Sequence, residues 1–251
     1  MIYFVGAGSG APDLITVRGA RLLSEADVIV YAGSLVNPAL LDYKKDGCEV
    51  YNSAKMTLEE VIAVMAPAAK AGKTVVRLHT GDPCVYGAHR EQMDELDRLG
   101  LAYEVCPGVS SFCGAAAALK AEYTLPNVSQ SVILTRMEGR TPVPEKEQIE
   151  SFAAHGATMV IFLSAGQLAR LSERLIAGGY APDTPAAIVY KATWPDEKVV
   201  RTTVADLAEA GAREGITKTA LITVGGFLGT EYERSKLYDP PFTTEFREAS
   251  R

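Results

Sequence analysis

The feature that most constrains the fold is a pattern that repeats through the first half of the chain: a short apolar run, a glycine-rich turn and then a helical pattern. The richest example is the stretch from Arg77 to Gly87, Arg-Leu-His-Thr-Gly-Asp-Pro-Cys-Val-Tyr-Gly, which begins at the end of an apolar run at 74–78. Gly81 and Pro83 interrupt regular structure within it. Loops of this kind at the carboxyl ends of parallel strands are where open α/β sheets bind ligands.

The same pattern occurs at two further strand ends. Gly6-Ala-Gly-Ser-Gly10 follows an apolar run at 2–5, and Pro107-Gly-Val-Ser-Ser111 follows a run at 103–106. Strands that alternate with helices at this spacing predict a parallel sheet with helices on both faces. We expect Asp13 to be the N-cap of a helix that extends to about residue 24, and we expect Pro67 to kink or end a helix over 58–71.

The whole chain is predicted to form two α/β domains, residues 1–121 and 122–251. The segment 122–129 is polar, contains Pro126 and has the composition of a linker. In the second domain only a short turn separates the strand that ends at Tyr190 from the strand that begins at Lys198. A parallel crossover needs a longer connection, so these strands should form a hairpin within a mixed sheet.

The composition excludes several function classes. The chain has 251 residues and a formal net charge of -6, which disfavours a nucleic-acid partner, although a local cluster of cations could still bind an anionic small molecule. No apolar run approaches the ~18–20 residues that a membrane helix needs, and the N-terminus lacks the features of a signal peptide. We therefore expect a cytoplasmic protein with no membrane partner.

Metal chemistry and serine hydrolysis are disfavoured by spacing. The four cysteines form no CxxC pair. Three histidines, His79, His89 and His155, have no carboxylate or cysteine at ligand spacing, so we predict no metal site. Ser110 and Ser111 do not stand in a nucleophile-elbow motif.

The glycine-rich turns also differ from the common nucleotide-binding motifs. In a dinucleotide site the carboxylate of Asp13 would repel the pyrophosphate, and the second strand ends in Tyr31-Ala-Gly-Ser34, with no acid for a ribose diol. Gly72-Lys-Thr74 precedes a strand, whereas a phosphate-binding loop follows one. The remaining pattern, small hydroxyls and Asp82 at glycine-rich strand ends, suits a nucleoside-type cofactor without a pyrophosphate.

Three motifs, taken together, resemble the tetrapyrrole methylases. They are Gly6-x-Gly-x-Gly-x-Pro-Asp-Leu14, Gly81-Asp-Pro-x-x-Tyr-Gly87 and Pro107-Gly-Val-Ser-Ser111, in the order that the family has them. The resemblance implies two α/β domains with S-adenosylmethionine in the cleft between them, a homodimer, and a small-molecule tetrapyrrole substrate. The segments 31–38, 77–83 and 86–92 are most similar to the branch that methylates carbon 11 of precorrin-4 or cobalt-precorrin-4.

The resemblance also assigns residues to the site by their position in the motifs. The implied cofactor contacts are Pro12, Thr80, Gly81, Asp82, Val85, Ser110, Ser111, Leu163, Ala192, Thr219 and Ala220. The implied substrate bears acetate and propionate groups, for which strand-end or loop cations of the second domain are candidates, namely Arg136, Arg140 and Lys191.

The implied reaction is an in-line displacement in which a ring carbon attacks the sulfonium methyl group. The family needs no covalent nucleophile, and alignment of the reactants supplies most of the catalysis. Glu91, His79 and Tyr86 are candidates for a base that removes a ring proton, and each has a plain structural role as its alternative. Three rival functions stay open: methylation at another precorrin position, methylation of a macromolecule (a diphthine or ribosomal RNA substrate), and a nucleotide sensor without catalysis.

Overall fold

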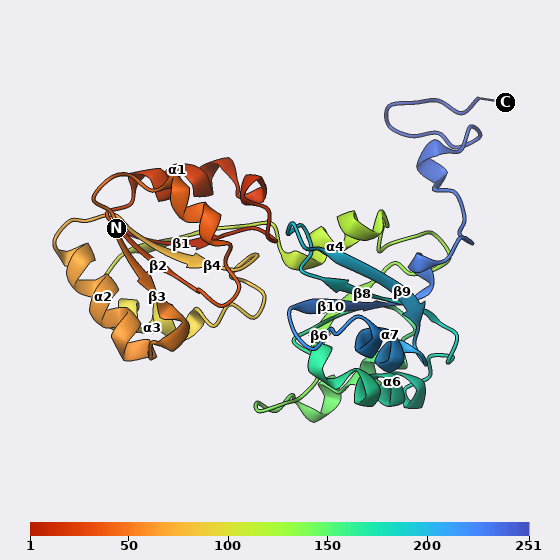
Figure 1. The fold of residues 1–251 in the computed structure, drawn as a ribbon. Helices are drawn as coiled ribbons and strands as arrows, with labels where there is room; N and C mark the ends of the chain where they lie inside the picture. The colour runs from red at the N-terminus through yellow and green to blue at the C-terminus, as the bar shows by residue number, and fades with distance from the viewer. Residues whose placement is uncertain (251) are drawn as a thin grey trace. The chain divides into compact units, whose positions relative to one another are not determined.

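The computed structural model describes residues 1–250, and its chain forms two compact units (Figure 1). The N-terminal unit comprises Met1–Gly114 together with the short segment Ala192–Asp196. The C-terminal unit comprises the other described residues after 114. The segment 192–196 thus belongs to the N-terminal unit although it lies far along the chain.

The N-terminal unit contains a five-stranded sheet in which every neighbouring pair is parallel. Its order is β3-β2-β4-β1-β5, and the strands are β1 (Ile2–Gly6), β2 (Val28–Tyr31), β3 (Glu49–Asn52), β4 (Val75–His79) and β5 (Tyr103–Cys106). Because β4 is inserted between β1 and β2, the loops that follow β1 and β4 leave the sheet side by side.

Helices cover both faces of this sheet, as the alternation of strands and helices predicted (Figure 1). Helix α1 (Val17–Glu25) packs Leu22 and Leu23 on one face. Helices α2 (Leu58–Lys70) and α3 (Arg90–Arg98) pack on the other. An apolar cluster lies between the sheet and the helices on each face, and its burial stabilises the packing of the helices on the strands.

Two local expectations about these helices need correction. Asp13 is not the N-cap of α1: Pro12–Leu14 forms a short 3-10 turn, and Thr16 caps the helix by accepting a hydrogen bond from the Gly19 N–H at 3.0 Å. Of the two outcomes expected at Pro67, a kink or a helix end, the helix end does not occur, because α2 continues to Lys70. A capping box at Thr57 starts α2.

The C-terminal unit contains a five-stranded mixed sheet of order β6-β7-β10-β8-β9. Only β6 and β7 run parallel, and β8 and β9 form the predicted antiparallel hairpin. The strands are β6 (Val132–Arg136), β7 (Thr158–Phe162), β8 (Pro185–Tyr190), β9 (Lys198–Thr203) and β10 (Ala220–Val224). Helix α4 (Ser111–Leu119) leads into this unit, and α5 (Ile149–Ala153), α6 (Leu168–Ala177) and α7 (Leu207–Arg213) bury one apolar cluster against the sheet. Within residues 1–250 no helix is long and apolar enough to cross a membrane.

Strand β4 places one histidine inside the apolar layer beneath α2 and α3. The side chain of His79 is 3% exposed, its ring stacks on Phe4 with 5.9 Å between centroids, and it meets the His89 ring edge-on at 5.8 Å. Burial, helped by the nearby charge of Arg77 and by His89, lowers the pKa of His79 to about 3. The imidazole is therefore neutral in the folded protein at neutral pH.

The buried neutral imidazole predicts a specific loss of stability in acid. An unfolded histidine has a pKa near 6.5, so between pH 6.5 and pH 3 the unfolded chain binds a proton at this residue and the folded chain does not. The free energy of unfolding therefore falls as the pH drops through this range, by at most about 1.4 kcal/mol per pH unit. His79→Gln should flatten this part of the profile in urea unfolding between pH 7 and pH 4. His155→Gln, which changes an exposed histidine, is the control. Equal slopes for His79→Gln and the wild type would contradict the assignment.

The ends of β1, β4 and β5 meet so closely that no side chain fits among them. A Cβ atom on Gly108 would lie 2.3 Å from the carbonyl oxygen of Gly81 and 2.7 Å from the Cα atom of Gly6. A Cβ on Gly6 would lie 2.6 Å from the backbone of Gly108. Because all these contacts are with backbone atoms, a rotamer change cannot relieve them.

Gly108→Ala should therefore lower the free energy of unfolding by about 1–3 kcal/mol, the usual cost of forcing extra atoms into a packed region. Urea denaturation at pH 7 measures this change. Gly139→Ala is the matched control, because its Cβ would meet nothing closer than 3.8 Å. A Gly108→Ala variant as stable as the control would show that the loops relax freely.

Candidate functional site

The loops that follow β1 and β4 are tied together by backbone hydrogen bonds. The Gly8 N–H donates to the Gly81 carbonyl at 3.2 Å, and the Gly81 N–H donates back to the Gly8 carbonyl at 2.9 Å. Both glycines have positive φ, +83° and +61°, a conformation that other residues rarely adopt. Two of the three predicted glycine-rich strand ends thus form one structure, and the third joins them through Gly108.

Asp82 connects this pair of loops to the loop after β5. Its Oδ1 accepts a hydrogen bond from the Cys84 N–H and its Oδ2 accepts one from the Gly108 N–H, both at 2.8 Å. Burial alone would raise the pKa of Asp82, but the hydrogen bonds from Cys84 and Gly108 outweigh burial and hold the pKa below its ordinary value. A carboxylate that stays ionised and accepts two N–H groups braces the loops, and it is a poor general acid.

Several predicted cofactor residues surround this brace. Thr80 precedes Gly81, and its Oγ1 is buried with no hydrogen-bond partner in the structure. Ser110 is 7% exposed, and Ser111 begins α4. Buried hydroxyls without partners are rare in folded proteins. The Thr80 hydroxyl is therefore suited to a polar ligand, and the donors present fit a nucleoside-type cofactor.

The segment 192–196 completes this group of loops. The Thr193 and Ser9 hydroxyls lie 3.1 Å apart, and the Thr193 hydroxyl also accepts a hydrogen bond from the Ala11 N–H at 3.0 Å. Trp194 covers Gly10, where a Cβ atom would lie 2.2 Å from the indole ring. The predicted contact Ala192 is 6% exposed in this segment, and the predicted contact Pro12 follows Ala11 directly. Thr193 and Trp194 are not among the residues predicted from the sequence.

A second group of predicted residues lies at one end of the C-terminal sheet. Leu163 follows β7, Lys191 follows β8, and Thr219 precedes β10. Since β10 is antiparallel to both neighbours, these three positions share one end of the sheet, and the Lys191 N–H donates to the Thr219 carbonyl at 3.0 Å.

All three of these residues have left-handed backbone. Their φ angles are 53° at Leu163, 46° at Lys191 and 56° at Thr219, and each such conformation costs about 1–3 kcal/mol in a non-glycine residue. Leu163 is also 65% exposed, so no buried side-chain packing explains its conformation. Ala220, the remaining predicted contact, is buried. Strain of this kind concentrates at functional sites, which makes this end of the sheet a candidate binding surface.

The three candidate bases differ in their surroundings. Glu91 is exposed in the first turn of α3. Tyr86 is 46% exposed and has a φ of 54°. His79 is buried, and its pKa of about 3 makes it a weak proton acceptor at neutral pH. The surroundings therefore argue against His79 as the base.

The three candidate substrate cations also differ. The Arg136 guanidinium donates to the carbonyls of Met137, Thr141 and Pro142, so it organises its own loop. Lys191 holds its ammonium 5.4 Å from the centre of the Tyr190 ring, and Arg140 is exposed. Among residues 1–250 no three His, Cys, Asp or Glu side chains form a group that could hold a metal ion.

Both the sequence and the fold are similar to those of known methyltransferases. The chain is 55% identical over 249 residues to the cobalt-precorrin-4 C(11)-methyltransferase of Methanocaldococcus jannaschii, with 99% of this chain and 96% of that protein covered. The X-ray structure of a cobalt precorrin-4 methyltransferase of cobalamin biosynthesis matches with a TM-score of 0.89 and 51% identity, covering 91% of this chain and 96% of that one.

A more distant solved structure is the uroporphyrin-III C-methyltransferase of Thermus thermophilus in complex with S-adenosylhomocysteine. It has a TM-score of 0.76 and 29% identity, and the match covers 90% of this chain and 98% of that one. The sequence model of the tetrapyrrole (corrin/porphyrin) methylases matches residues 1–208. On its glycine-rich loops, its two α/β units and these similarities, the chain belongs to the tetrapyrrole methylase family.

Proposed function

We propose that this protein transfers a methyl group from S-adenosylmethionine to carbon 11 of precorrin-4 or cobalt-precorrin-4, a step of cobalamin biosynthesis. The observation that carries the proposal is the 55% identity to a cobalt-precorrin-4 C(11)-methyltransferase over nearly the full length of both chains. Segments 31–38, 77–83 and 86–92, which lie within this match, resemble the same branch.

The loops of the N-terminal unit are the proposed cofactor contacts. Thr80 offers an unpartnered hydroxyl, Gly81 and Ser110 offer small side chains and backbone groups, and Asp82 fixes the loops through its two accepted hydrogen bonds. Pro12, Val85, Ser111, Leu163, Ala192, Thr219 and Ala220 complete the proposed set.

When bound, S-adenosylmethionine supplies a methyl group on a positively charged sulfur. The protein's part is to align that group with the ring carbon, and alignment of two reactants can contribute about 7–11 kcal/mol to a rate. Rigid loops are suited to this task because their backbones are locked by mutual contacts rather than by mobile side chains. Glu91 is the proposed base if a ring proton must be removed, because it is exposed and carries a carboxylate.

We also propose that the protein works in the cytoplasm as a homodimer, on the strength of its resemblance to the family. Methylation at a different tetrapyrrole position is the second candidate function, favoured by the similarity to a uroporphyrin-III C-methyltransferase at 29% identity. A nucleic-acid substrate is disfavoured by the net charge of -6.

The cofactor assignment predicts the binding preference of the purified protein. In isothermal titration S-adenosylhomocysteine should bind, whereas ATP and NAD should not. Asp82→Ala should weaken S-adenosylhomocysteine binding by roughly tenfold or more, equivalent to about 1.4 kcal/mol, because the Gly108 and Cys84 N–H groups lose their acceptor. Asp94→Ala, which removes a surface carboxylate on α3, should bind normally. Unchanged affinity in Asp82→Ala would refute the role given to Asp82.

The substrate assignment predicts where the new methyl group appears. Incubation with precorrin-4 or cobalt-precorrin-4 and S-adenosylmethionine labelled with 13C at its methyl group should place the label on carbon 11, as located by NMR. A label at carbon 17 or carbon 20 would replace this assignment with the second candidate function. Binding of a dinucleotide in place of the sulfonium cofactor would overturn the methyltransferase proposal altogether.

A further inference from the structure

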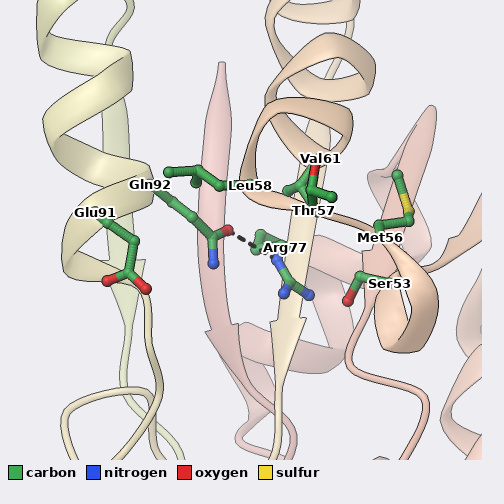
Figure 2. A pocket seen from close by; sticks show the side chains of 8 residues that line it. All are labelled: Ser53, Met56, Thr57, Leu58, Val61, Arg77, Glu91 and Gln92. Atoms are coloured by element: carbon green, nitrogen blue, oxygen red, sulfur yellow. Dashed lines mark hydrogen bonds between the residues drawn. The ribbon is translucent and has the colours of Figure 1, made fainter.

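A small pocket of about 140 Å³ opens in the N-terminal unit on the side of the sheet covered by α2 and α3 (Figure 2). Its walls come from the segment after β3, the start of α2, the middle of β4 and the start of α3. The lining residues are Ser53, Met56, Thr57, Leu58, Val61, Arg77, Glu91 and Gln92. None of the predicted cofactor contacts lines it.

Arg77 is the unusual member of this set. Its side chain projects from β4, with only 6% of the residue exposed. Its Nε donates to Gln92 Oε1 at 2.9 Å, and its Nη1 donates to the Val30 carbonyl at 3.2 Å. Both acceptors are neutral. No carboxylate of residues 1–250 lies within ion-pair distance of this guanidinium.

A buried cation without a counter-ion is costly, and proteins normally pair such charges. Burial lowers the pKa of Arg77 to about 10, so the group remains charged at neutral pH. A guanidinium has five N–H donors, and the hydrogen bonds to Gln92 and Val30 use two of them. The other donors can bind a ligand in the pocket. The planar group suits a carboxylate, which can accept two parallel hydrogen bonds.

The remaining walls match a carboxylate on a short alkyl chain. Most of the exposed lining is polar, to which Ser53 and Thr57 contribute, and Met56, Leu58 and Val61 supply the smaller apolar part. The N-terminus of the 13-residue helix α2 at Thr57 adds a favourable dipole. The volume is about four to five times the ~30 Å³ that one water molecule occupies in the liquid, which is too small for a macrocycle.

One negative charge also lines the pocket. Glu91 is exposed on α3, and in Figure 2 its carboxylate lies across Gln92 from the Arg77 guanidinium. The pocket therefore carries one cation held inside it and one anion at its exposed side. An anionic ligand that enters the pocket would neutralise the charge of Arg77.

We propose that this pocket is a subsite for one carboxylate side chain of the substrate, held on the Arg77 guanidinium. The identity of the substrate as a tetrapyrrole with acetate and propionate arms rests on the proposed function. The assignment differs from the sequence expectation, which placed the substrate's cations in the second domain at Arg136, Arg140 and Lys191.

The hydrogen-bond pattern gives this subsite a connection to the cofactor loop. Gln92 accepts from Arg77 through Oε1 and donates through Nε2 to the Ala88 carbonyl at 2.8 Å. Ala88 has a φ of 46° and closes the loop that begins at Thr80. A carboxylate bound to Arg77 would therefore hold Arg77 in place, and through it Gln92, whose side chain binds the end of the loop 80–88 at Ala88.

The first test separates substrate binding from cofactor binding. In Arg77→Met the KM for the tetrapyrrole should rise about 10- to 100-fold, the loss expected for a hydrogen bond to a charged group. The affinity for S-adenosylhomocysteine should stay within about twofold of the wild type. Arg98→Gln, which removes an exposed arginine at the other end of α3, should leave the KM unchanged. An unchanged KM in folded Arg77→Met would overturn the proposal.

A second test needs no variant and no activity. Propionate, titrated into the wild-type protein, should shift the NMR signal of the Arg77 Nε–H group, whereas propionamide, its neutral isostere, should not. An equal response to the two compounds, or none to either, would overturn the proposal even if Arg77→Met fails to fold. Failure of the proposed function would look different: the wild type would methylate no tetrapyrrole, and the response to propionate would persist.

Discussion

The close approach of three backbones, at Gly6, Gly81 and Gly108, is the constraint on which the N-terminal unit depends. A Cβ atom on Gly6 or Gly108 would lie within 2.7 Å of neighbouring backbone atoms. The strand ends can therefore approach this closely only if both positions are glycine. Because they meet, the Gly108 N–H reaches the Asp82 carboxylate. Steric necessity thus comes first, and the hydrogen-bonded brace follows from it.

The two charged groups near β4 show opposite uses of burial. Asp82 has its charge satisfied within the protein by N–H donors, and the hydrogen bonds lower its pKa despite burial. Arg77 has only neutral hydrogen-bond acceptors, and burial lowers its pKa because it disfavours the charged form. The first arrangement is complete without a ligand and stabilises a loop. The second would gain from an anion. The loop after β4 thus holds a charge that serves rigidity, and the middle of β4 holds the charge to which we assign recognition.

The sequence predicted the parallel sheet, the helices on both faces and the loops because these depend on local periodicity and on glycine. It failed where the outcome depends on contacts distant in sequence. Thr193 and Trp194 lie more than 180 residues from Ser9 and Gly10, which they contact, so no local sequence pattern could bring them together. Asp13 does not cap α1 because Pro12–Leu14 forms a 3-10 turn, so the helix begins only after Thr16. The sequence places Arg77 in a strand, as the structure does, but its partners Gln92 and Val30 lie 15 and 47 residues away, where no local pattern predicts them.

The strained residues of the C-terminal unit show how a rigid core supports an unfavourable conformation. Leu163, Lys191 and Thr219 each follow or precede a strand whose interior is fully packed, with Ile161, Ile188 and Ile222 buried in one cluster. The register of β10 against β7 and β8 fixes the positions of the strand ends. The residues at the strand ends must then adopt the φ angles that connect these fixed positions. The Lys191–Thr219 hydrogen bond offsets part of the conformational free energy that this costs. A strand end can hold a strained backbone in place for binding because the apolar cluster packed around the strand is rigid.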